Sequence, residues 1–85
     1  MSKKDKLLKR LEAKPTDFTY HELKTLLKYL GFVENNQGKT SGSRVTFWAE
    51  SLNQVIMLHK PHPGNILKEY QIKQVITALK KVGVI

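Results

Sequence analysis

Apolar residues recur at helical spacing in three stretches of this 85-residue chain. In residues 3–13 leucines follow that spacing among lysines until Pro15 interrupts it, which predicts a short basic amphipathic helix. A leucine stripe predicts a second helix from Tyr20 to Leu30, and another apolar stripe predicts a third over residues 68–82. Each predicted helix has one apolar face, and we expect the two longer helices to cover one face of a sheet.

Local signals mark the ends of two of these helices. Thr19 followed by Glu22 forms a capping box, in which the threonine side chain accepts from a first-turn amide and the glutamate returns to the amide of Thr19. Gly31 and Gly83 follow the second and third apolar stripes, and glycine supplies the left-handed backbone at which helices often end. The second helix is therefore delimited at both of its ends.

In the middle of the chain, apolar residues recur with a period of two instead of the helical period. A brief strand is predicted to begin at residues 32–33, and residues 44–48 and 54–59 form two further strands. Pro61 ends the last strand because proline cannot donate a ladder hydrogen bond. The glycine- and serine-rich segment 35–43 is predicted to be a loop. Short connections between successive strands favour an antiparallel meander.

The order helix, helix, three strands, helix predicts an α+β fold with a single domain core. We expect a two-layer sandwich in which helices cover one face of a three-stranded antiparallel sheet, an α-β-β-β-α core with an extra N-terminal helix. Residues 19–85 are predicted to form the domain, and residues 1–18 a basic helical extension. The extension either pads the core or adds an arm for RNA or for a partner protein.

Charge and composition narrow the functional classes. The chain has 15 Lys and Arg against 7 Asp and Glu, and its net charge of +8 favours a polyanionic partner, nucleic acid before anionic membrane. The absence of cysteine excludes a disulfide scaffold, a thiolate metal site and a cysteine nucleophile. No apolar run is long enough to span a bilayer or to resemble a signal peptide, so we expect a cytoplasmic protein without a membrane partner.

The segment "LHKPHPGN" contains His59 and His62 on either side of Lys60. Histidine exchanges a proton near neutral pH and lysine holds a phosphate, and a metal-free RNA-cleaving site requires both roles. We predict that His59 and His62 are catalytic, although ordinary strand-end and turn residues are the alternative. With no cysteine and only His21 elsewhere, zinc would need carboxylate ligands, so we expect no metal and no cofactor.

Further cations and donors are candidates for binding RNA. In the polar loop, Lys39 and Ser43 offer donors to an anion, although a loop without a ligand is the alternative. Lys60 stands between the two histidines, and Lys68 and Lys73 lie in or beside the start of the third helix, near that segment. These lysines are predicted to bind phosphate, the alternative being a solvated helix face.

Aromatic residues are candidates for stacking on bases. Trp48, Tyr20, Tyr29 and Tyr70 are able to stack in a single-strand site. The alternative is structural, with Tyr29 and Tyr70 packed beside the leucine stripes and Trp48 covering a sheet edge.

Four segments together resemble the HicA-type toxins of bacterial and archaeal toxin-antitoxin pairs. They are "YHELKTLLKYLGFVE", "SGSRVTF", "LHKPHPGNILK" and "YQIKQVITALKKVGV", and the resemblance spans about residues 20 to 84. It implies a fold like the double-stranded RNA-binding domain, an mRNA endonuclease activity and a HicB-type antitoxin as partner.

One position departs from the motif of that family. The motif is glycine, serine and a catalytic histidine, followed after two residues by an aromatic, and this chain has Gly42, Ser43, Arg44 and Phe47 there. Arginine stays protonated and cannot act as a general base, but its forked donors can hold a phosphate. His62 matches the later histidine of the family's turn.

Three hypotheses follow. In the first, the chain is a HicA-like toxin that cleaves single-stranded mRNA, with a histidine transferring the proton and Arg44 among the phosphate ligands. In the second, a module of the same fold binds RNA or an antitoxin without cleaving. In the third, the chain is a small DNA-binding or protein-docking module. The first hypothesis requires Arg44 and the histidine segment to lie on one side of the molecule; RNA sequence preference and oligomeric state stay open.

Overall fold

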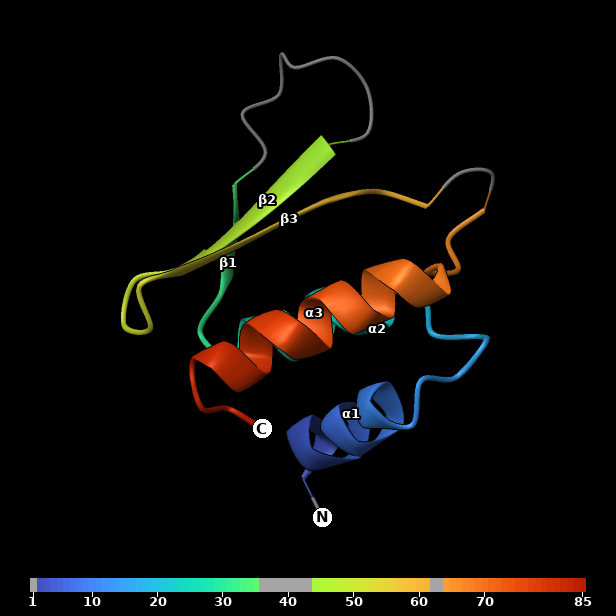
Figure 1. The fold of residues 1–85 in the computed structure, drawn as a ribbon, viewed down its shortest axis with the longest axis horizontal. Helices are drawn as coiled ribbons and strands as arrows, with labels where there is room; N and C mark the ends of the chain where they lie inside the picture. The colour runs from blue at the N-terminus through green and yellow to red at the C-terminus, as the bar shows by residue number, and fades with distance from the viewer. Residues whose placement is uncertain (1, 36–43, 62–63) are drawn as a thin grey trace.

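The computed structural model describes residues 2–35, 44–61 and 64–85 (Figure 1). Within these ranges the chain forms three helices and three strands in the order predicted from the sequence. The predicted loop lies almost wholly outside the described residues, as does His62. The elements are α1 (Lys3–Glu12), α2 (Tyr20–Tyr29), β1 (Val33–Asn35), β2 (Arg44–Ala49), β3 (Gln54–His59) and α3 (Glu69–Lys81).

The three strands form one antiparallel sheet in the order β1-β2-β3, so β2 is the central strand. Alternate residues of β2 and β3 are buried toward the helices, and the residues between them point to the opposite face. The buried set is Val45, Phe47, Ala49, Ile56 and Leu58. The predicted antiparallel meander with one buried face is therefore confirmed.

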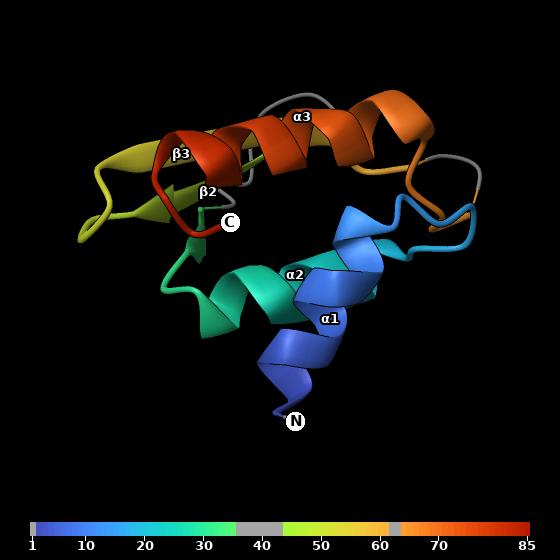
Figure 2. The same ribbon diagram turned by 60° about the horizontal axis from the view of Figure 1, so that its bottom comes forward.

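The helices gather on one side of the sheet (Figure 1). α2 packs beside β1 and α3 beside β3, while α1 packs against both of these helices. Figure 2 shows α1 lying across α2, with α3 beside the sheet. Leu7 and Leu11 of α1 belong to the same apolar core as the leucines of α2 and the apolar face of α3. α1 therefore contributes to the core; the boundary predicted between residues 18 and 19 stays a prediction.

An ion pair connects α1 to the beginning of α2. The predicted capping box is present, because the Thr19 side chain accepts from the amide of Glu22 and the Glu22 carboxylate accepts from the amide of Thr19. Arg10 Nε donates to Glu22 Oε2 at 2.8 Å. This hydrogen bond from Arg10 lowers the pKa of Glu22 to about 2, so the carboxylate is ionised at neutral pH.

Candidate nucleic-acid interface

The face of the sheet opposite the helices carries a mixture of basic, polar and apolar side chains. Among the described residues this outer face includes one arginine and one histidine and no carboxylate. All of its members are exposed except Thr46, which is half-buried. The outer face consists of Val33 and Asn35 on β1, Arg44, Thr46 and Trp48 on β2, and Val55, Met57 and His59 on β3.

Arg44 and His59 lie directly opposite each other at one end of the outer face. They are paired residues of β2 and β3, so their side chains project from the same side of the sheet. The Arg44 guanidinium reaches back over the sheet, where Nη1 lies 3.8 Å from Met57 Sδ. The first hypothesis required this common orientation, and the described part of the chain has it.

Both side chains open into a groove between β3 and α3, which we call the site groove. Its volume is about 200 Å³. It combines a fixed cation, an imidazole that can carry a proton, and a tyrosine ring that is 61% exposed. The groove is lined by Arg44, Met57, Leu58, His59, Tyr70, Gln71 and Gln74.

Two glutamines of α3 attach that helix to the free edge of β3. Gln71 is only 3% exposed, and its Nε2 donates to the carbonyl of His59 at 2.7 Å. Its Oε1 accepts from the amide of Lys68 at 3.0 Å, at the start of α3. Gln74 Nε2 donates to the carbonyl of Met57 at 2.8 Å. The edge carbonyls of β3 are thereby satisfied, and the backbone of His59 is held against α3.

Replacing Gln71 with methionine is expected to lower the free energy of unfolding by about 1–3 kcal/mol, because two backbone groups lose their partner. The matched variant Gln74→Met removes one hydrogen bond from an exposed side chain and should cost less than about 1 kcal/mol. Urea denaturation at neutral pH measures both. Equal losses in the free energy of unfolding of the two variants would contradict the larger contribution to stability that is expected from Gln71.

Lys60 does not lie in the site groove. Its ammonium is 5.8 Å from the ring centroid of Tyr20, which packs beside Phe47 on the helical side of the sheet. Tyr20 donates to Glu34 at 2.8 Å, and Lys24 pairs with the same carboxylate at 3.0 Å. Burial and the Glu34 hydrogen bond raise the pKa of Tyr20 above its usual value. Lys60 thus adds positive charge to a cluster on the other side of the sheet.

The remaining predicted RNA-binding and catalytic residues fall into two groups. Lys68 and Lys73 are exposed on or beside α3, and neither belongs to the described residues that line the site groove. Lys39, Ser43 and His62 lie outside the described residues. The structure therefore brings Arg44 and His59 together, and the roles of the other candidates stay predictions.

A model of the family described as the HicA toxin of bacterial toxin-antitoxin matches residues 20–84. The chain belongs to the HicA toxin family. This HicA chain is thereby a toxin of the toxin-antitoxin class, and family membership implies a cognate antitoxin as its partner. No curated protein and no solved structure matches it significantly. The match leaves out α1, whose residues Leu7 and Leu11 belong to the core.

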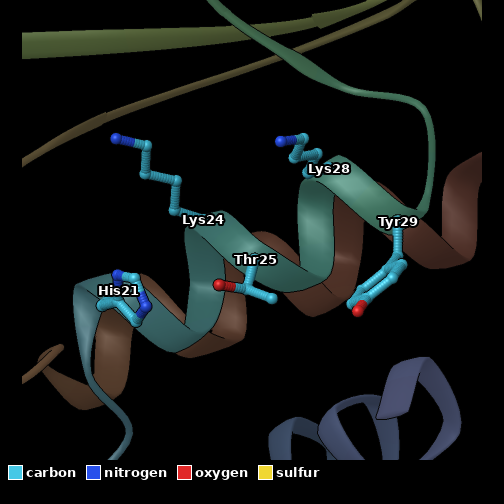
Figure 3. A pocket seen from close by; sticks show the side chains of 5 residues that line it. All are labelled: His21, Lys24, Thr25, Lys28 and Tyr29. Atoms are coloured by element: carbon cyan, nitrogen blue, oxygen red, sulfur yellow. The ribbon is translucent and has the colours of Figure 1, made fainter. Parts of the chain in front are cut away.

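A wider pocket of about 600 Å³ runs along α2 of the HicA chain. Figure 3 shows Lys24 and Lys28 extending on one side of α2 and Tyr29 on the other, with His21 near the start of the helix. All of its described lining residues come from this one helix, and Lys24 is paired with Glu34. The site groove, in contrast, is lined by residues of three elements, β2, β3 and α3.

Sequence reasoning missed the α3 side of the groove. Tyr70 does not pack beside the apolar stripe but lines the groove, and Gln71 and Gln74 contact β3. Their spacing gave a weak signal, because residues 70, 71 and 74 share one side of a helix.

No helix in the described part of this HicA chain is long and apolar enough to cross a membrane. No group of three or more metal-ligating side chains occurs in the same described part.

Proposed function

We propose that this HicA toxin binds single-stranded mRNA at the site groove and cleaves it in the cytoplasm by metal-independent phosphodiester chemistry. The supporting observation is the Arg44–His59 pair, whose side chains share the outer face and line one groove. The net charge of +8 favours a polyanionic substrate. The site groove is small, so it accommodates one phosphodiester with its adjoining sugar rather than a duplex.

Each residue of the pair has a role that suits its chemistry. The imidazole of His59 removes the proton from a ribose 2′-hydroxyl, and the 2′-oxygen then attacks the adjacent phosphorus. The guanidinium of Arg44 binds the phosphate oxygens and stabilises the charge that develops on them. The bond from phosphorus to the 5′-oxygen breaks, and that oxygen takes up a proton. His62, the second candidate acid or base, is the proposed proton donor in this step.

The partner of the toxin is proposed to be a HicB-like antitoxin. Family membership implies a cognate antitoxin, and the resemblance of the sequence to HicA-type toxins implies the HicB type. An antitoxin that covers the site groove would exclude RNA from Arg44 and His59.

A second candidate function is RNA binding without cleavage. Arg44 favours it, because it occupies the place of the catalytic histidine in the motif implied by the resemblance and cannot accept a proton. In this case His59 would contribute only a hydrogen bond. A gel shift without shortened products at saturating protein would support this function.

Growth of an expressing cell tests the proposed function. Expression of the wild-type chain alone should arrest growth, and co-expression of the antitoxin-like product of the neighbouring gene should restore it. RNA extracted during the arrest should contain shortened mRNA. Normal growth at a confirmed soluble level of the protein would contradict the proposal.

A further inference from the structure

A second concavity lies at the other end of the outer face from the Arg44–His59 pair. It has a volume of about 520 Å³, and we call it the Trp48 hollow. Gly31, in a left-handed conformation with φ of 94°, adds no side chain to it. The hollow is lined by Gly31, Val33, Trp48, Glu50 and Ser51.

Trp48 gives the hollow an aromatic wall. It is the only tryptophan in the chain, it is 38% exposed, and it lies on the central strand rather than covering an edge. Val33 and Val55 are its paired neighbours on the two flanking strands, and both are exposed. An exposed indole between apolar neighbours on an open sheet is a platform on which a nucleobase can stack.

The outer face connects the hollow to the proposed cleavage site. Trp48 is the fourth residue after Arg44 on the same strand, at a distance of about 13 Å that a short run of extended nucleotides can bridge. The Arg44 guanidinium already leans toward the hollow, since it contacts Met57. No carboxylate lies between them among the described strand residues of this face. A phosphate backbone therefore meets no negative charge along this path.

The carboxylate of Glu50 gives the Trp48 hollow the opposite charge to the Arg44 end of the path. A carboxylate repels phosphate but accepts hydrogen bonds from the donor groups on the edge of a base. Guanine presents two such donors side by side on its Watson–Crick edge, a pattern that one carboxylate can accept in a bidentate manner. The hollow thus combines a stacking surface with an acceptor that favours guanine.

We propose that the Trp48 hollow binds a guanine base of the single-stranded RNA whose phosphate is held at Arg44. This inference rests on the proposed function, because the RNA strand is the ligand at both ends of the outer face. The base stacks on Trp48, and Glu50 accepts from its edge. The hollow then fixes which phosphodiester reaches His59, and it makes this HicA toxin selective for sites near a guanosine.

Trp48 fluorescence provides a direct test, because no other tryptophan contributes to the signal. Short oligouridines that carry one guanosine, one adenosine or neither are titrated into the His59→Ala variant, which keeps the RNA intact. The guanosine oligomer is expected to quench Trp48 and to bind about 10-fold more tightly than all-uridine RNA. Equal affinities for all oligomers, with unquenched fluorescence, would overturn the proposal.

Variants separate the contribution of base stacking on Trp48 from that of hydrogen bonding to Glu50. The Kd of each variant for RNA is measured by the anisotropy of labelled RNA. Trp48→Ala should weaken binding of the guanosine oligomer by about 5- to 100-fold, whereas Trp48→Phe should retain most of the affinity. Glu50→Gln should remove most of the preference for guanosine but keep the quenching. Tyr29→Ala, the matched loss of an exposed aromatic ring on α2, should change neither Kd nor preference.

Different experimental results would refute the guanine site and the proposed function. RNA binding that depends on Arg44 but not on Trp48 overturns the inference alone. Trp48→Ala that leaves RNA binding intact but abolishes rescue by the antitoxin also overturns it, because the hollow would then bind a protein. Guanosine-dependent quenching that persists undiminished in Arg44→Ala supports the hollow and contradicts the phosphate site. Absence of any RNA binding overturns both.

Discussion

Replacing His59 with alanine is expected to reduce RNA cleavage by at least about 100-fold and to abolish growth arrest. The reason is that His59 is the one histidine among the described residues that line the site groove, and histidine is the side chain that exchanges a proton near neutral pH. It also lies opposite the arginine that is proposed to hold the phosphate. Its side chain is exposed at the end of β3, so the loss should not come from unfolding. Initial rates with labelled single-stranded RNA measure the effect.

The matched control is His21→Ala. His21 is also exposed, but it lies on α2, away from the site groove. Its variant should cleave RNA and arrest growth like the wild type. If His59→Ala and His21→Ala both cleave at the wild-type rate, His59 is not catalytic and the proposed mechanism is wrong.

Replacing Arg44 with alanine is expected to weaken RNA binding by about 10- to 100-fold, because a charge-assisted contact to phosphate is lost. The slope of log Kd against log salt concentration should fall by about 0.7, the share of one phosphate contact on single-stranded RNA. Arg44→Lys should recover part of the affinity but less of the cleavage rate, since lysine keeps the charge without the planar fork. Anisotropy titrations over a range of salt concentrations measure these changes.

Lys28→Ala provides the charge-matched control for Arg44. It removes one exposed positive charge from α2, outside the site groove and outside the outer face. A small uniform loss of affinity is expected from the lower net charge. If Lys28→Ala weakens binding as much as Arg44→Ala does, general electrostatic attraction explains the binding and no specific phosphate contact exists at Arg44.

Local sequence signals predict the helices and strands, and they predict the part of the site groove that β2 and β3 form with Arg44 and His59. The residues 50–53 between β2 and β3 form a short connection, which brings Ala49 opposite Gln54 and so places Arg44 opposite His59. Strand alternation then assigns both side chains to the outer face. The capping box at Thr19 was likewise readable, because its two hydrogen bonds form between residues three apart.

Features that depend on packing between distant parts of the chain cannot be predicted from such local signals. The position of α3 along the edge of β3, which brings Tyr70 and Gln71 to the groove, results from burial of its apolar stripe and not from a local motif. The alternation of β3 also carries a signal for the position of Lys60. A residue that follows an outward-facing His59 in an alternating strand is expected on the other side of the sheet, where its ammonium lies near Tyr20.

The most direct test of the account is the chemistry of the RNA ends left by the pure wild-type protein in EDTA. Attack by the ribose 2′-oxygen predicts fragments that carry a 2′,3′-cyclic phosphate and a 5′-hydroxyl, with no requirement for added metal. RNA that stays intact in EDTA, or fragments that carry a 5′-phosphate, would contradict metal-independent cleavage at Arg44 and His59.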